Sequence, residues 1–165
     1  MRTRDGIEYS IRPITPADAR REREFIAAMS PLSIYQRFLY VLGEPSADMI
    51  EHLVNVDGHR HMALVATVGA ADAEHFIGVA RYAADNEGTD CEFALAVADA
   101  WQCRGIGTTL APMLFEHAAA QGFRRVYGYV LAANDRMLGL CHYLGLTIDS
   151  RPVDNGLVRA WRWLD

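Results

Sequence analysis

The stretch that decides the fold is residues 91–110, "CEFALAVADAWQCRGIGTTL". In residues 91–98 larger and smaller side chains alternate, which predicts a strand with one bulky face and one nearly bare face. The next segment places two glycines two positions apart, and from Leu110 onward apolar residues recur at helical spacing. The sequence therefore predicts a strand, a glycine loop and a helix in immediate succession.

The glycine loop places main-chain N–H groups at the N-terminus of a helix, where they favour an anion such as phosphate. The loop lacks the lysine that an ATP-binding P-loop has after its second glycine, and Leu110 occupies the third glycine position of the dinucleotide pattern. ATP and NAD are thus disfavoured as ligands. Glycine spacing alone fits a plain strand-to-helix turn as well as a phosphate cradle.

The bulk composition predicts one globular domain over residues 1–165, because 51% of the residues are hydrophobic and 22% are charged. A net charge of -5, without a Lys/Arg-rich run, argues against nucleic acid or an anionic membrane as the main partner. No signal-peptide core opens the chain, and no run of about 18 apolar residues occurs. We therefore expect a cytoplasmic protein.

Cysteines and histidines give no metal pattern. Cys91, Cys103 and Cys141 lie far apart and form no C-x-x-C pair, so we expect reduced thiols and no disulfide or metal framework. The one close histidine pair, in "HRH" at residues 59–61, has no further ligand nearby and is interpreted as a loop that enters a strand.

Hydrophobic periodicity predicts the remaining elements. Strands are expected at residues 8–14, 61–68, 75–83, 124–131 and 157–164, and helices at 16–29, 30–40, 46–56 and 134–145. Thr15, Ser46 and Asn134 are the predicted N-caps. Pro112 conflicts with the helix after the glycine loop, since a proline in a helix interior costs about 3 kcal/mol. Either that helix bends, or it begins later than the pattern suggests.

Residues 90–146 resemble the acetyl-CoA-binding core of the GNAT acyltransferase superfamily. Its Q/R-x-x-G-x-G/A signature is matched by the stretch 102–107, "QCRGIG", and its N-x-x-M…L-G-F helix by "NDRMLGLCHYLGL", with Leu146 in place of Phe. "SIRPITPADA" and "LSIYQRFL" extend the resemblance to the acetyltransferase domain of bacterial Pat-type protein lysine acetyltransferases. The resemblance implies the GNAT fold, an α/β (α+β) architecture in which about four helices flank a mixed, mostly antiparallel sheet of six to seven strands.

The resemblance also implies acetyl-CoA as cosubstrate, without a metal. The residues expected to bind it are those of the strand, the glycine loop and the start of the later helix: Leu95, Ala96, Val97, Gln102, Cys103, Arg104, Gly105, Ile106, Gly107, Thr108 and Asn134.

An amine acceptor requires a base, because a lysine ammonium has a pKa of about 10.4 and attacks a thioester only after losing a proton. In the Pat-type family the glutamate of the E-F-A segment is the proposed general base, and Glu92 matches it. Its own strand face carries only alanines, which leave room for a substrate, and partial burial would raise its pKa as a base needs. A surface carboxylate on an edge strand is the alternative.

Two further roles follow from the resemblance. The family stabilises the carbonyl oxygen of the reacting thioester with a backbone N–H near Leu95. Many members protonate the leaving thiolate with a tyrosine, but Cys141 occupies that position and Tyr143 lies about 200° around the helix from it. No general acid is assigned, and Cys141 is interpreted as a packing residue.

The leading hypothesis is an acetyl-CoA-dependent N-acetyltransferase that acts on a protein lysine. The residues leave open a small-molecule amine as acceptor, and a non-catalytic module that binds or senses acyl-CoA. They also leave open the acyl-chain preference and the oligomeric state. Tyr35 and Arg37 fit either the acceptor side or a structural role, whereas Trp161 and Trp163 fit packing better than substrate recognition.

Overall fold

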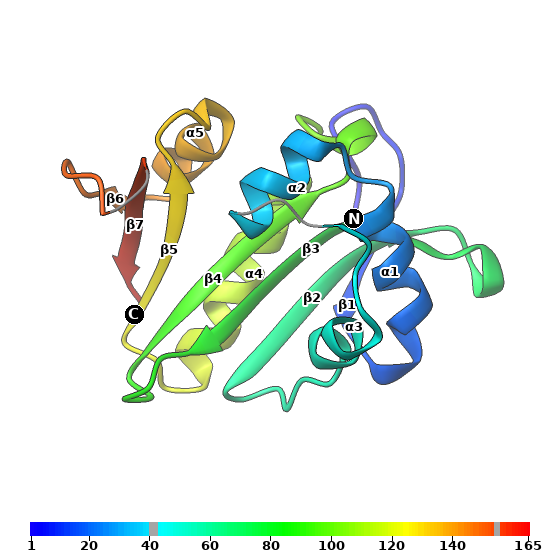
Figure 1. Cartoon of the computed structure of the whole chain (residues 1–165), viewed down its shortest axis with the longest axis horizontal. Coiled ribbons are helices and arrows are strands. Elements are labelled where there is room, and N and C mark those ends of the chain that lie inside the picture. The colour runs from blue at the N-terminus through cyan, green and yellow to red at the C-terminus, as the bar shows by residue number, and fades with distance from the viewer. Residues whose placement is uncertain (40–42, 154–155) are drawn as a thin grey trace.

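The computed structural model describes residues 1–39, 43–153 and 156–165. Its centre is a seven-stranded sheet in the order β1-β2-β3-β4-β5-β7-β6 (Figure 1). The strands are β1 (Ser10–Pro13), β2 (His61–Val68), β3 (His75–Ala84), β4 (Asp90–Val97), β5 (Arg125–Leu131), β6 (Thr147–Ile148) and β7 (Leu157–Trp163). Neighbouring strands in this sheet run antiparallel except β4 and β5, which are parallel. The predicted mixed, mostly antiparallel sheet is therefore confirmed.

Five α-helices flank the sheet in the described ranges, where about four were expected. They are α1 (Ala19–Ala27), α2 (Pro31–Phe38), α3 (Ala47–Val54), α4 (Ile106–Ala120) and α5 (Asp135–Tyr143). Three 3₁₀ turns lie between β1 and α1, between β2 and β3, and between β4 and α4: η1 (Pro16–Asp18), η2 (Ala71–Ala73) and η3 (Asp99–Trp101). The short α2 is a helix of its own because Ser30 caps it and Pro31 opens its first turn. The expected end of this helix at Tyr40 lies outside the described residues.

The predicted caps of two other helices are confirmed. The side chains of Ser46 and Asn134 accept hydrogen bonds from the backbone N–H groups of Met49 and Met137. In the described part of the chain no helix is long and apolar enough to cross a membrane.

Pro112 lies inside α4, which runs without interruption from Ile106 to Ala120. The helix therefore begins directly after the glycine loop. The proline removes the N–H that would otherwise bond to the carbonyl of Thr108.

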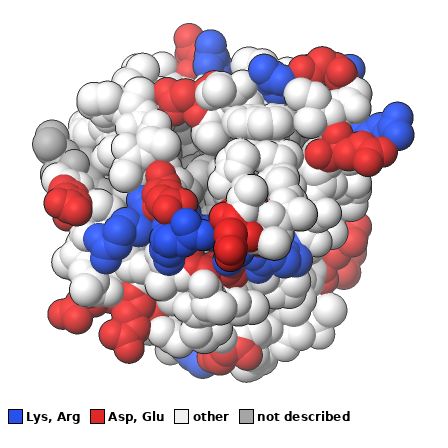
Figure 2. All heavy atoms as spheres, turned by 90° about the vertical axis from the view of Figure 1, so that its right-hand side faces the viewer, with Lys and Arg blue, Asp and Glu red and all other residues white. Residues whose placement is uncertain are grey.

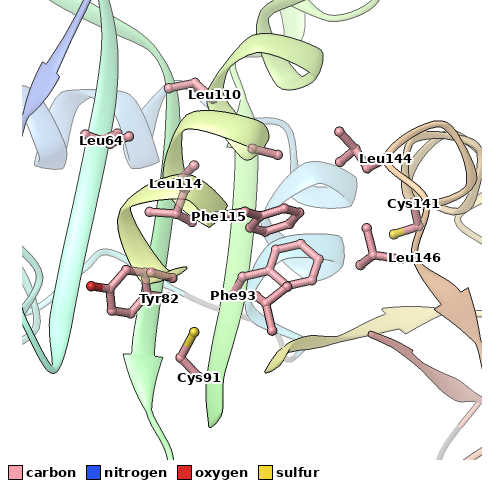
Figure 3. Packing of buried hydrophobic residues seen from close by; sticks show 14 of the residues in the cluster. Leu64, Tyr82, Cys91, Phe93, Leu110, Leu114, Phe115, Cys141, Leu144 and Leu146 are labelled. Atoms are coloured by element: carbon pink, nitrogen blue, oxygen red, sulfur yellow. The ribbon is translucent and has the colours of Figure 1, made fainter. Parts of the chain in front are cut away.

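The sheet separates two hydrophobic clusters. On one face α4 packs over β2, β3 and β4, and Phe115 of this helix meets Phe93 of β4, with Leu114 in the same cluster (Figure 3). The rings of Phe93 and Phe115 meet edge to face with centroids 5.2 Å apart. On the other face Ala96 joins the cluster beneath α1 and α3. The alternation expected in β4 is confirmed, with its bulky face toward α4.

The sheet edge at β1 is fixed by charge pairs. Figure 2 shows positive and negative side chains side by side across this face. Arg12 of β1 donates to Asp18 at 2.7 Å and to Glu74 at 2.7 Å, and Arg21 of α1 pairs with both carboxylates. The Arg12 hydrogen bond lowers the pKa of the buried Asp18 to about 2. This network ties β1, α1 and the β2–β3 hairpin together.

Candidate active site

The central feature of the site is the short pairing of β4 with β5. Only Asp90, Cys91 and Glu92 pair with β5, opposite residues 125–127, and beyond them the two strands separate (Figure 1). Just past this junction, a Cβ on Gly128 would lie 2.8 Å from Phe93 Cε1 and 3.0 Å from the Phe93 carbonyl oxygen. The absence of a side chain at residue 128 thus lets the strands meet before they diverge.

A cleft of about 660 Å³ fills the opening between the two strands. Its walls come from α2, β4, the glycine loop, the first turn of α4, the end of β5 and the first half of α5. Of the residues expected to bind acetyl-CoA, those that line it are Leu95, Ala96, Val97, Gln102, Cys103, Gly105, Ile106, Gly107, Thr108 and Asn134.

Two expected site residues lie outside this lining. The Arg104 side chain pairs with Asp5 at 2.6 Å and stacks on Trp101 at 5.2 Å, so only its backbone belongs to the loop. Glu92 is exposed at the closed end of the cleft, two residues before Ala94, which does line it. Residues two apart on a strand share one face and lie about 7 Å apart.

The open edge of β4 offers free backbone groups to the cleft. Ala98 donates its N–H to Ile77 of β3, so in this regular antiparallel pairing the even-numbered residues of β4 bond to β3. The N–H and C=O of Leu95 therefore point away from β3, toward the opening. The side chain of Gln102 donates to the Val97 carbonyl at 3.2 Å, which agrees with this direction.

Backbone conformation and close packing explain why glycine occupies positions 105 and 107. Gly105 adopts φ = 92°, a left-handed conformation that glycine takes without strain. A Cβ on Gly107 would lie 3.1 Å from a Leu140 methyl and 3.3 Å from a Leu95 methyl. Close packing of α4 against β4 and α5 thus accounts for the second glycine. The same packing places the first turn of α4, whose N–H groups have no intrahelical partner, in the wall of the cleft.

Gln102 joins three walls of the cleft. Its amide donates to Ser33 Oγ of α2 at 3.4 Å as well as to Val97, and its carbonyl oxygen accepts from Arg136 of α5 at 2.8 Å. Sequence reasoning missed Ser33 and Arg136 as lining residues, because neither belongs to the loop motif. Arg37 of α2 also lines the cleft, and this position favours a role on the acceptor side over a purely structural role.

The electrostatics of Glu92 suit a base. Partial desolvation raises its pKa above the ordinary value for glutamate, while the positive charge of Arg37 lowers it. Tyr127, opposite Glu92 in the parallel register, has a raised pKa because of burial and the nearby glutamate, and so stays protonated. Glu92 therefore shares its surroundings with one positive group and one phenol.

Two of the three cysteines are buried in the core, and the third is exposed. Cys91 and Cys141 are buried, and burial raises their pKa values to about 12 and about 11, whereas Cys103 is an exposed free thiol. Cys141 is thus the packing residue that its position suggested. His61 begins β2, as interpreted, and the described residues contain no cluster of three or more His, Cys, Asp or Glu suited to a metal ion.

Comparison with known proteins identifies the family. Residues 31–146 match the acetyltransferase (GNAT) family. The chain belongs to the GNAT acetyltransferase family. An acetyltransferase of Pseudomonas aeruginosa is 36% identical over 151 residues, which cover 92% of this chain and 81% of that protein.

Two relatives are Pat proteins. The acetyltransferase Pat of Mycolicibacterium smegmatis is 32% identical over 146 residues, 88% of this chain but only 43% of that protein. The crystal structure of the GNAT domain of S. lividans PAT superposes with a TM-score of 0.90 at 31% identity, and the match covers 99% of this chain and 95% of that one. This GNAT chain therefore spans less than half of the mycobacterial Pat but matches an isolated Pat GNAT domain almost end to end.

A Gly128→Ala substitution tests the junction of the two strands. The added methyl meets Phe93 ring and backbone atoms, so we expect a loss of about 1–3 kcal/mol of unfolding free energy in urea. Because the strands can then no longer meet, acetyl-CoA binding measured by calorimetry should weaken at least about tenfold.

Gly139→Ala is the matched control. It lies in α5 with no atom within 4 Å of the added Cβ, so alanine should stabilise the helix by about 0.5–1 kcal/mol and leave binding unchanged. Wild-type stability and affinity in the Gly128→Ala protein would contradict the role of this junction.

Proposed function

We propose that this protein is an acetyl-CoA-dependent N-acetyltransferase whose acceptor is the side chain of a protein lysine, with Glu92 as general base. The observation that carries the proposal is the cleft between β4 and β5, which joins an unpaired strand edge to the N-terminus of α4. This pair of features suits a ligand that has both an amide-bearing arm and a phosphate group.

The residues of the cleft divide between those two parts of the ligand. The unpaired N–H and C=O of Leu95 and the N–H of Val97 suit the amides of the pantetheine arm, by the same hydrogen bonds that pair strands. The loop from Gln102 to Thr108 and the dipole of α4 suit the pyrophosphate. Asn134 opens α5 on the opposite wall. Bound there, acetyl-CoA supplies an activated thioester.

Glu92 removes the proton that stops the amine from reacting. A lysine ammonium beside Ala94 gives its proton to the Glu92 carboxylate through one bridging water, because residues two apart on a strand lie about 7 Å from each other. The free nitrogen then bonds to the thioester carbonyl carbon, the carbon–sulfur bond breaks, and the second N–H proton passes through water to the departing thiolate, so that the products are the acetylated lysine and the thiol form of CoA. The unpaired Leu95 N–H would donate to the carbonyl oxygen as that oxygen gains negative charge.

Similarity to Pat GNAT domains supports a protein lysine as acceptor over a small amine. The support comes from the S. lividans domain, which matches this chain over 99% of its length. The test is to incubate the protein with acetyl-CoA and a bacterial lysate, and to map acetyl-lysine by mass spectrometry. All 16 basic Lys/Arg positions of this chain are arginine, so every acetyl-lysine found belongs to an acceptor.

We expect new acetyl-lysine on a defined protein. Transfer to polyamines or aminoglycosides but to no protein would overturn the lysine assignment. Tight binding of acetyl-CoA without transfer to any amine would favour a sensor instead.

A Glu92→Gln substitution tests the base. The amide keeps the size of the side chain but accepts no proton, so kcat/KM for the acceptor should fall about 100-fold or more while acetyl-CoA affinity is unchanged. Glu87→Gln, an exposed glutamate in the preceding turn, is the control and should behave as wild type. Full activity of the Glu92→Gln protein would remove Glu92 from the mechanism.

An Arg37→Gln substitution tests the electrostatics around the base. The positive charge of Arg37 favours the carboxylate form of Glu92, so its loss should raise the Glu92 pKa. Because the base works only when deprotonated, activity falls as the pH drops through that pKa. The acidic limb of the kcat/KM profile should therefore move to higher pH, and an unmoved or lowered limb would contradict this arrangement.

A further inference from the structure

One face of β5 and β7 carries a continuous row of aromatic and arginine side chains. In the antiparallel register Arg125 lies opposite Trp163, Tyr127 opposite Trp161, and Tyr129 opposite Arg159, so each pair shares one face of the sheet. The alternate residues, such as Val126 and Ala160, are buried on the α4 side. We call the row the aromatic platform: Arg125, Tyr127, Tyr129, Arg159, Trp161 and Trp163.

The platform is not covered by a helix in the described structure. On this side of the sheet α1 and α3 lie over the strands near β1, α2 lies in front of β4, and the front of β5 and β7 is open (Figure 1). Trp161 is partly exposed, and Trp163 is 57% exposed. Trp163 thus departs from the packing role expected from the sequence, because local alternation does not tell whether a helix covers the face of a strand.

The side chains of the platform hold one another in place. The Arg125 guanidinium lies 5.8 Å and 5.4 Å from the ring centroids of Trp161 and Trp163, and those two rings meet edge to face. The Trp161 indole N–H donates to Asp149 at 2.9 Å, and Arg159 donates to the same carboxylate. Rings fixed in this way lose little conformational entropy when a partner binds.

The charges of the platform are already balanced. Arg125 pairs with Asp90, and Arg159 pairs with Asp149. What the platform presents is therefore ring surface rather than net charge. Such a surface suits apolar and aliphatic side chains of a polypeptide, and it offers little to a highly charged small molecule such as a polyamine.

The platform is continuous with the candidate active site. Tyr129 lines the cleft, and Tyr127 stands opposite Glu92 in the β4–β5 register. β5 is seven residues long, or about 23 Å, which matches an extended peptide of six to seven residues and far exceeds one amino acid. A chain laid along β5 brings one of its side chains to Glu92.

We propose that the aromatic platform docks the polypeptide segment that flanks the acceptor lysine, so that the enzyme selects a lysine within an extended chain over a free small amine. This inference rests on the proposed lysine acetyltransferase activity. Affinity comes from apolar contact of the flanking residues with the rings of Trp161 and Trp163, and the position of the lysine comes from the register along β5.

The test compares two acceptors of identical chemistry. One is a set of seven-residue peptides with a central lysine and apolar neighbours, and the other is Nα-acetyl-lysine methylamide, which has no flanking residues. In the wild-type protein we expect kcat/KM for the best peptide to exceed that for the single residue by at least about tenfold. Trp163→Ala should remove most of this preference through KM, without changing acetyl-CoA affinity or the rate with the single residue.

Two variants serve as controls. Trp163→Phe keeps a ring and should retain much of the preference. Tyr143→Ala removes an aromatic side chain that is 73% exposed on α5 and is not part of the platform. It should leave kcat/KM for both acceptors unchanged.

The outcomes separate the two proposals. Equal rates for peptide and single residue, or a preference that survives Trp163→Ala, would overturn the docking role while the transfer activity stands. A wild-type dimer in light scattering that dissociates on Trp163→Ala would assign the platform to a second copy of the chain and likewise overturn it. Transfer to neither acceptor would overturn the lysine activity, and with it this inference.

Discussion

The three residue pairs that join β4 to β5 are the constraint on which the rest of the site depends. Parallel strands normally pair along their length, so that their facing backbone N–H and C=O groups bond to each other. Here the pairing stops at Glu92 and Tyr127, and Phe93 occupies the space over Gly128. One strand edge is thereby left free, and the cleft opens between β4 and β5, next to the first turn of α4. The Asp90–Arg125 ion pair holds the strands together at the closed end.

The positive charge of Arg37 on α2 acts on two glutamates, the proposed base Glu92 and the buried Glu22 of α1. Arg81 of β3 is largely buried and donates to Glu22 of α1 at 2.8 Å and to the Leu53 carbonyl at 3.0 Å. Burial raises the pKa of Glu22, and the positive charges of Arg81 and then of Arg37 lower it; Arg37 also lowers the pKa of Glu92. α2 therefore carries one cation that acts on both glutamates. The positive charge on this short helix favours the carboxylate form of Glu92.

Local patterns in the sequence predicted much of this architecture. The alternation of residues 91–98, the caps Ser46 and Asn134, and the strand–loop–helix order are all properties of neighbouring residues, and the structure has each of them. The glycine-loop residues that line the cleft were expected from the resemblance of residues 102–107 to the GNAT signature.

What the sequence did not reveal depends on contacts between distant segments. The cost of a side chain at Gly128 comes from Phe93, 35 positions away, and the Arg104 side chain is drawn from the cleft by Asp5. The exposure of Trp163 depends on which helices cover which strands. Neither periodicity nor motif spacing carries that information, because it arises only when the sheet order is fixed.

Amide hydrogen exchange with and without acetyl-CoA, followed by mass spectrometry, tests most directly whether this cleft binds acetyl-CoA. We expect added protection in the free edge of β4 at residues 94–97 and in the loop and first turn of α4 at residues 102–108, and little change at the β1 edge of the sheet. Protection confined to other regions, or none at saturating acetyl-CoA, would contradict the assignment of this cleft as the acetyl-CoA site.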